Sequence, residues 1–224
     1  MHTLHEQAPV DEEQPAALRV ADELRSSILV GDLRPDARVR DVSVAAEHGV
    51  SRNTARAALH QLEMEGLVTS RRHSGYSVRR LTTDDVLEIF KVRRIIELSA
   101  VRSSGRSPQA LLAEVNNRVI EAEQLVRSGR WHQVETASLY FHQALVDLAE
   151  SKTLSGFFRT QLAQLRLAFA LMPGESERQV DWIPRDRAIC DLLRSGEREA
   201  AAKALEEYLD QSEIELLDSL RRWG

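Results

Sequence analysis

The chain has 224 residues, more than an ordinary single domain, and this length favours two domains. Its residues are 42% hydrophobic and 29% charged, as in soluble globular proteins, and no stretch approaches the roughly 18 apolar residues that a membrane span requires. The first residues are polar and acidic, which argues against a secretory signal, and the single Cys190 excludes an internal disulfide. We therefore expect a cytoplasmic protein with a flexible tail at residues 1–14.

The formal net charge of −5 is unevenly distributed along the chain. Residues 15–81 carry eleven Arg against eight Asp and Glu, a net charge of +3. Residues 82–224 carry nineteen Lys and Arg against twenty-three acids, a net charge of −4. This asymmetry suits a nucleic-acid-binding N-terminal part on an acidic body.

Three helices are expected in the N-terminal part. Residues 15–30 repeat apolar side chains at helical spacing and end at Gly31. Two shorter helical patterns, residues 42–48 and 52–65, flank the turn Gly49-Val50-Ser51. A helix, a tight turn with glycine and a second helix capped by serine form a helix-turn-helix.

A β-hairpin, the wing, is expected directly after these helices. Residues 67–71 and 76–79 alternate apolar and polar side chains around a turn at residues 72–75. The turn is basic and is suited to contact with the minor groove or the backbone of DNA. The candidate contacts on the wing are Arg71, Arg72 and His73.

The second helix of a helix-turn-helix enters the major groove with its first turns, so residues there should hydrogen-bond to bases and phosphates. Arginine can bind guanine through two N–H groups, asparagine can bind adenine in the same way, and hydroxyl groups hold phosphates. The candidates on this helix are Ser51, Arg52, Asn53, Thr54 and Arg56. The alternative is that these arginines form only a solvated surface.

Several groups of residues between positions 24 and 78 match one family pattern: Leu24-Arg25, Ile28-Leu29, Gly31, Gly49-Val50-Ser51-Arg52, Arg56, Ala58-Leu59, Leu62-Glu63, Glu65-Gly66-Leu67-Val68 and Gly75. The segment closely resembles the N-terminal signature of the GntR family of bacterial regulators. The resemblance implies that the helix residues above and the wing, including Gly75, contact DNA. Family members usually have Thr-Pro-Val where this chain has Asn53-Thr54-Ala55, and glycine where it has Asp36. These departures suggest an unusual base preference and leave the fold unchanged.

From Thr83 onward the sequence shows only helical periods. They are interrupted at residues 105–108, 129, 151–155, 173–174 and 195–196. This predicts an all-α antiparallel bundle of about six helices, with Thr82 or Thr83 capping the first long one. The expected fold is thus mainly α, with a winged helix-turn-helix at residues 15–81 and a helical domain at residues 82–224.

Polar residues fall on the inward faces of several of these helices. In chain order they are Arg93, Glu97, Ser138, His142, Arg166, Asp186 and Tyr208. Buried charges are costly unless they are paired or used, so these residues are candidates for an effector site between helices, with Trp182 at its border. The alternative is that Arg93 and Glu97 form a structural ion pair and that the others are polar core residues that satisfy one another.

The segment from about Asp84 to Trp223 resembles the FadR-type C-terminal domain, or FCD domain, through Arg93-x-x-x-Glu97 and Phe141-His142. The resemblance implies a divalent metal bound by an Asp and a His four positions apart and by two later His residues. At those positions this chain has Ser138, His142, Asp186 and Tyr208, and serine and phenol are poor Zn²⁺ ligands. We therefore expect no cofactor and no tightly bound metal, but an organic effector whose carboxylate pairs with Arg93.

These expectations combine into a homodimeric DNA-binding transcription regulator, most simply a repressor, whose affinity for operator DNA changes when a small molecule binds its C-terminal domain. In the alternative, the C-terminal domain only dimerises and its ligand site is degenerate. The sequence argues against an enzyme because it has no glycine-rich phosphate loop and no nucleophile elbow. Moreover, Ser138 and His142 on one helix offer no oxyanion hole.

Overall fold

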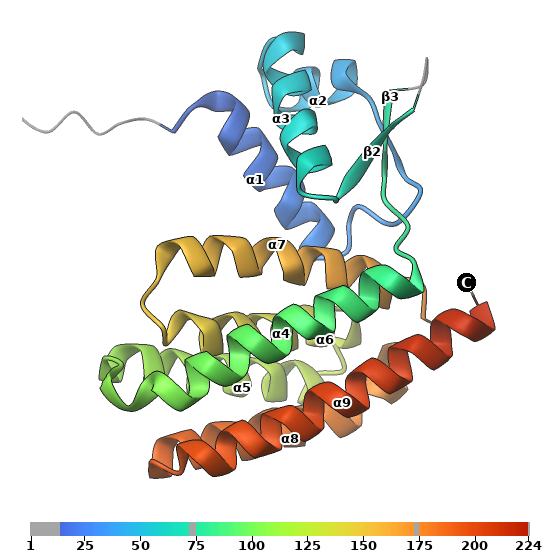
Figure 1. Cartoon of the computed structure of the whole chain (residues 1–224). Coiled ribbons are helices and arrows are strands. Elements are labelled where there is room, and N and C mark those ends of the chain that lie inside the picture. The colour runs from blue at the N-terminus through green and yellow to red at the C-terminus, as the bar shows by residue number, and fades with distance from the viewer. Residues whose placement is uncertain (1–13, 72–74, 173–174, 224) are drawn as a thin grey trace, which may run out of the picture.

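The computed structural model describes residues 14–71, 75–172 and 175–223. Figure 1 shows a small N-terminal part of helices and a sheet that stands on one side of a larger bundle of long helices. Within the described ranges, no helix combines the length and apolar character needed to cross a membrane.

The N-terminal part is built on α1 (Ala16–Leu29), α2 (Asp41–Glu47) and α3 (Arg52–Met64), whose bounds lie within one residue of the predicted ones. The apolar face of α1 packs against α3, and both faces are fully buried. The buried residues of this contact include Val20, Ala21, Leu24, Ile28, Ala55, Ala58, Leu59 and Leu62. Helix α3 begins where Ser51 caps it, because the serine hydroxyl accepts a hydrogen bond of 3.1 Å from the Thr54 N–H.

The wing is a three-stranded antiparallel sheet in the order β1-β3-β2. The predicted hairpin is formed by β2 (Val68–Arg71) and β3 (Gly75–Val78), and β1 (Arg38–Val39) adds to the free edge of β3. The sequence did not indicate β1, because a two-residue strand is too short to show alternation. Asp36, just before β1, has a φ of 67°, a left-handed conformation that favours glycine and that aspartate tolerates better than most residues.

The C-terminal part contains six described α-helices, as expected. They are α4 (Thr83–Ser103), α5 (Gln109–Arg127), α6 (Trp131–Asp147), α7 (Lys152–Phe169), α8 (Glu175–Ser195) and α9 (Arg198–Trp223), with a 3₁₀ turn η1 (Ser104–Arg106) after α4. Thr82 is the N-cap of α4 and forms a capping box with Asp85. The four helices α4, α5, α7 and α8 pack around α6, so α6 is the central helix of the bundle.

Candidate nucleic-acid interface and buried polar site

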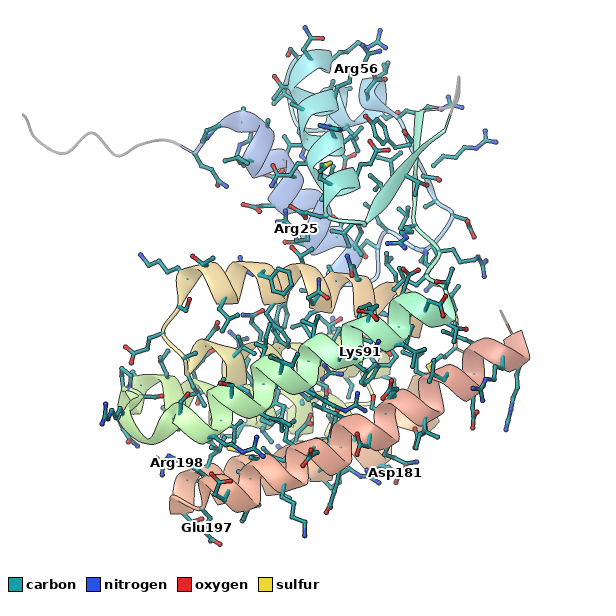
Figure 2. All side chains as sticks on the ribbon, in the orientation of Figure 1. Arg25, Arg56, Lys91, Asp181, Glu197 and Arg198 are labelled. Atoms are coloured by element: carbon teal, nitrogen blue, oxygen red, sulfur yellow. The ribbon has the colours of Figure 1, made fainter. Side chains whose placement is uncertain are left out.

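The exposed start of α3 carries the residues predicted to contact DNA. Arg52, Asn53 and Arg56 are exposed together on its first turns, and Figure 2 places Arg56 on the side of the N-terminal part far from the bundle. The hydroxyl groups of Ser51 and Thr54 lie 2.8 Å apart and bond to each other. Helix α3 therefore presents two arginines and an asparagine to the solvent, and its cap is already formed.

Asp41, in the first turn of α2, also belongs to this face and was not predicted from the sequence. Its carboxylate accepts hydrogen bonds from Arg56 Nε at 2.6 Å and from Arg52 Nη2 at 3.1 Å. These bonds, that of Arg56 above all, hold the pKa of Asp41 below its ordinary value. No periodicity indicates this contact, because it depends on how α2 crosses α3.

On the wing, Arg71 ends β2 and its Cα pairs with that of Gly75 at the start of β3. Gly75 has a φ of 79°, and a Cβ there would lie 3.4 Å from the Val39 carbonyl oxygen, so the position favours glycine for structural reasons. Arg72 and His73 lie outside the described residues, and their contact with DNA stays a prediction.

In the bundle, Arg93 and Glu97 of α4 and His142 of α6 form one buried chain of polar contacts. Glu97 accepts from Arg93 Nε at 2.6 Å, and its other oxygen lies 2.6 Å from His142 Nδ1. Burial raises the pKa of Glu97, but Arg93 and His142 more than offset this and lower it. Burial lowers the pKa of His142 despite Glu97, so a neutral imidazole donates from Nδ1 and leaves Nε2 as an acceptor.

A second chain joins Ser138 of α6, Asp186 of α8 and Tyr208 of α9. The Ser138 hydroxyl donates to Asp186 Oδ2 at 2.9 Å and lies 3.4 Å from the Tyr208 hydroxyl. Burial raises the pKa of Asp186 well above its ordinary value, although the bond from Ser138 opposes this. Burial, with Asp186 nearby, also raises the pKa of Tyr208. Burial therefore favours the neutral form of both side chains.

A cavity lies where these two chains meet. Four of the predicted effector-site residues line it: Arg93, Ser138, His142 and Tyr208. The remaining lining residues are Glu135, Leu139, Phe169, Met172, Trp182, Ser212, Glu215 and Leu216. The space open to the centre of a water molecule is about 30 Å³, enough for one or two waters. Glu97 and Asp186 do not line the cavity, but they form hydrogen bonds with residues that do.

Three buried polar atoms of these two chains have no hydrogen-bond partner among the described residues: Arg93 Nη2, His142 Nε2 and Asp186 Oδ1. Buried polar groups are nearly always paired, so an unpartnered donor on Arg93 and an unpartnered acceptor on His142 in one cavity wall indicate a place for a polar ligand. Glu135 connects this wall to the next helix, since Arg166 of α7 lies 2.7 Å from its carboxylate and both side chains are buried. Arg166 itself is not part of the wall.

The donors of this site do not fit a Zn²⁺ ion. Among the described residues there is no group of three or more His, Cys, Asp and Glu placed to hold a metal. His142 Nε2 is one good ligand atom, but burial favours the neutral form of Asp186, which is bonded to Ser138, and the remaining positions carry a serine and a phenol. A metal site of this type needs ionised carboxylates or imidazoles, and the absence of a tightly bound metal, expected from the sequence, stays a prediction.

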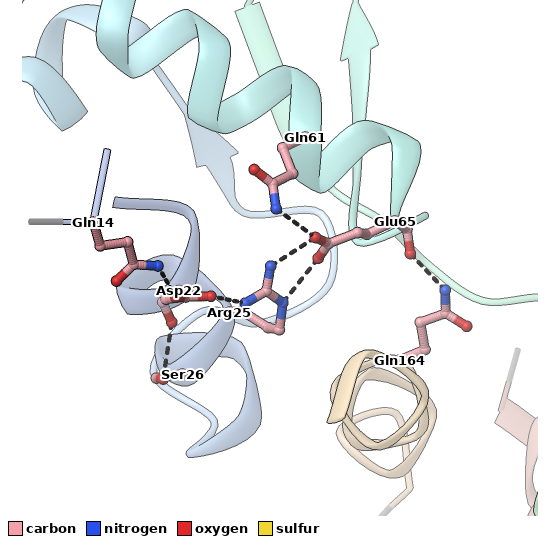
Figure 3. A network of polar contacts seen from close by, with 7 residues as sticks. All are labelled: Gln14, Asp22, Arg25, Ser26, Gln61, Glu65 and Gln164. Carbon is pink, nitrogen blue, oxygen red and sulfur yellow. Dashed lines mark hydrogen bonds and ion pairs between the residues drawn. The ribbon is translucent and has the colours of Figure 1, made fainter. Parts of the chain in front are cut away.

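The N-terminal part and the bundle are joined by specific hydrogen bonds at α7. Gln164 of α7 donates from Nε2 to the main-chain oxygen of Glu65 at 2.6 Å (Figure 3), and α1 packs against the same helix. The carboxylate of Glu65 is held by Arg25 through bonds of 2.8 and 2.6 Å. Thr136 of α6 adds a bond of 3.3 Å to the Leu29 carbonyl oxygen. The end of α3 is thus fixed both to α1 and to the bundle.

Family comparisons cover both parts of the chain. The family of bacterial regulatory proteins called gntR matches residues 16–78, and the FCD domain matches residues 88–211. The crystal structure of a putative transcriptional regulator GntR from Rhodococcus sp. RHA1 has a TM-score of 0.83 and 31% sequence identity. The match covers 91% of this chain and 98% of that one.

Two curated relatives are also similar to this chain. A probable D-xylose utilization operon transcriptional repressor of Paenarthrobacter nicotinovorans is 28% identical, over 86% of this chain and 85% of that protein. An uncharacterized HTH-type transcriptional regulator, YdhC, of Bacillus subtilis (strain 168) is 29% identical, over 65% of this chain and 66% of that protein. These relatives are named as regulators rather than as enzymes.

Proposed function

We propose that a small organic acid bound in the helical bundle controls the affinity of this protein for DNA. The chain belongs to the GntR family of bacterial regulatory proteins and carries an FCD domain, and it is therefore a transcription regulator. The proposal includes a homodimer whose two α3 helices bind the half-sites of a short palindrome. In the simplest form the regulator is a repressor that releases DNA when the effector binds.

The DNA face proposed here comprises the start of α3 and the wing. Arg52, Asn53 and Arg56 are exposed on one side of α3 and carry the donor and acceptor groups that distinguish bases in the major groove. The hydroxyl groups of Ser51 and Thr54 and the N-terminus of α3 suit the phosphates beside them.

The observation that carries the effector proposal is the cavity with unpartnered polar atoms on Arg93 and His142. Arg93 Nη2 can donate to a carboxylate or carbonyl oxygen of the ligand. His142 Nε2, an acceptor while the imidazole is neutral, can accept from a hydroxyl group. The effector that satisfies both is an acid that also carries a hydroxyl group.

A path from this cavity to the DNA-binding part supports control of DNA affinity. Glu135 in the cavity wall pairs with Arg166 of α7, and Gln164, two residues earlier on α7, bonds to the end of α3. A ligand that displaces Glu135 would therefore shift the helix that holds the N-terminal part. Such coupling requires that the effector bind one arrangement more tightly than the other.

The test is thermal denaturation of the protein with sugar acids, hydroxy acids and dicarboxylates, each with and without Zn²⁺ and a chelator. We expect a hydroxy acid to raise the Tm, since a ligand at 100 times its Kd stabilises by about 2.7 kcal/mol. Arg93→Lys, which removes Nη2 and keeps the charge, should abolish the shift. Arg94→Lys makes the same change at the contact of α4 with α9, where Arg94 pairs with Asp210 and Glu213, and should leave the shift unchanged.

A second candidate is a regulator whose C-terminal part only dimerises and whose ligand site is degenerate. The observation that favours it is the small space of about 30 Å³ between side chains that largely satisfy one another. This candidate predicts that no compound shifts the Tm and that operator binding is the same with and without the panel. A Tm shift with Zn²⁺ alone would contradict both candidates.

A further inference from the structure

Asp41 stands between the two arginines that α3 presents to DNA. Its side chain is 18% exposed, whereas those of Arg52 and Arg56 are 58% and 60% exposed. Arg56 bonds to Asp41 through Nε, and Arg52 bonds to it through Nη2. One carboxylate on α2 therefore contacts two long, exposed side chains that belong to another helix.

We propose that Asp41 is a positioning residue that holds Arg52 and Arg56 ready for guanine and opposes binding to DNA of any other sequence. This inference rests on the proposed DNA face of α3. Guanine is recognised when one guanidinium donates two N–H groups to its O6 and N7 atoms. Because Asp41 occupies only Nε of Arg56, the Nη1 and Nη2 edge of that guanidinium stays free for such a pair.

The same carboxylate acts on affinity in two opposite ways. A fixed arginine loses less conformational freedom when it binds a base, and this gain occurs only where a guanine is present. The negative charge repels phosphates and keeps each arginine from turning towards the backbone, and this cost falls on every sequence alike. Only the first effect changes the ratio of specific to non-specific affinity, and it raises that ratio, whereas the second lowers both affinities.

The experiment begins with selection of a palindromic duplex from a random double-stranded DNA library by the full-length wild-type protein. The Kd values for the selected duplex and for a scrambled duplex of equal composition are then measured by fluorescence anisotropy over a range of KCl concentrations. The variants are Asp41→Asn, the conservative Asp41→Glu, and Glu47→Gln as a control, which removes one charge at the exposed end of the same helix.

For Asp41→Asn we expect the ratio of the two Kd values to fall at least tenfold. On the scrambled duplex, the slope of log Kd against log salt should steepen by about 0.9, as one more arginine becomes free to bind a phosphate. Asp41→Glu should recover most of the ratio, and Glu47→Gln should change both Kd values together. Equal thermal melting of the variants shows that they are folded.

Two results would overturn the proposal. One is a ratio for Asp41→Asn within twofold of the wild-type ratio, and the other is an equal loss with Glu47→Gln, which would indicate a general effect of charge. If the wild-type protein selects no sequence at all, the proposed DNA face itself is wrong, and this outcome is recognised before any variant is measured.

Discussion

Relative to the wild-type protein, Asp186→Asn should gain unfolding free energy steadily as the pH rises above about 4. In the native protein this carboxyl group is fully buried, and burial raises its pKa well above the ordinary value. Ser138 donates to Oδ2, while Oδ1 has no partner among the described residues. An asparagine keeps the acceptor for Ser138, but its amide lies where no partner is described, so the substitution itself costs about 1–3 kcal/mol at every pH.

The sign follows from the protons bound in each state. Above about pH 4 the unfolded chain has lost the proton of Asp186, whereas the native state keeps it until its raised pKa is reached. In this window folding takes up a proton, so the wild-type protein loses about 1.4 kcal/mol of unfolding free energy per pH unit relative to the variant. The titrations of Glu97 and His142 occur in both proteins and largely cancel in the difference.

The assay is urea unfolding followed by circular dichroism, in steps of half a pH unit from 4.5 to 8, for the wild-type protein and for Asp186→Asn. Asp191→Asn, the same chemical change at an exposed position of α8, serves as the control. The reasoning is refuted if the difference in unfolding free energy between the wild-type protein and Asp186→Asn stays constant over this range. A difference that moves in the opposite direction would mean that Asp186 is ionised in the folded protein.

Three further changes test other parts of the structure. Glu97→Gln leaves the buried guanidinium of Arg93 without its counter-charge and should cost about 3–5 kcal/mol of unfolding free energy, measured by urea unfolding. Gln164→Ala removes the donor to the Glu65 main-chain oxygen and should cost about 1 kcal/mol, measured in the same way. Restoring the ligand set that the FCD resemblance implies should create a metal site, so that Zn²⁺ raises the Tm and EDTA reverses the shift, in a variant with Ser138→Asp, Asp186→His and Tyr208→His.

Each of these changes has its own control. If Arg93→Met together with Glu97→Gln is as unstable as Glu97→Gln alone, the cost does not come from an unpaired charge. Gln161→Ala, on the same helix as Gln164, is the matched control for the junction, and an equal loss of stability there would count against the bond to Glu65. For the metal, an identical Tm shift of the wild-type protein with Zn²⁺ would show that the native donor set already suffices.

The helices could be predicted because their signals are local. Apolar residues recur every three or four positions, and residues such as Ser51 and Thr82 cap their own helices within three positions of the sequence. The strand β1 could not be predicted in this way, because its two residues are held by pairing with β3, almost forty positions later. The pairing that makes these residues a strand depends on the tertiary structure and not on the residues next to them in the sequence.

The buried site shows the same limit. Arg93 and His142 could be found because each is a polar residue on an apolar helical face, and both line the cavity. Glu135 and Ser212 also line it and were missed. Helix α6 is packed by other helices on nearly all sides, so even residues off its apolar stripe are buried. A helical wheel drawn from the sequence of one helix does not show which other helices surround it. Asp41 was missed for a similar reason, since its partners lie on α3.

The bond between Ser138 and Asp186 restricts the order in which this site can change during evolution. An aspartate introduced at position 138 alone would place a second carboxyl group directly against Asp186, where both side chains are buried. Two such groups cannot both ionise at low cost, so a lineage that reached this intermediate would lose stability before it gained a ligand. Position 186 must therefore change first or at the same time. The present pair therefore makes a stepwise change to a metal-binding site harder than a change to a site for another neutral ligand.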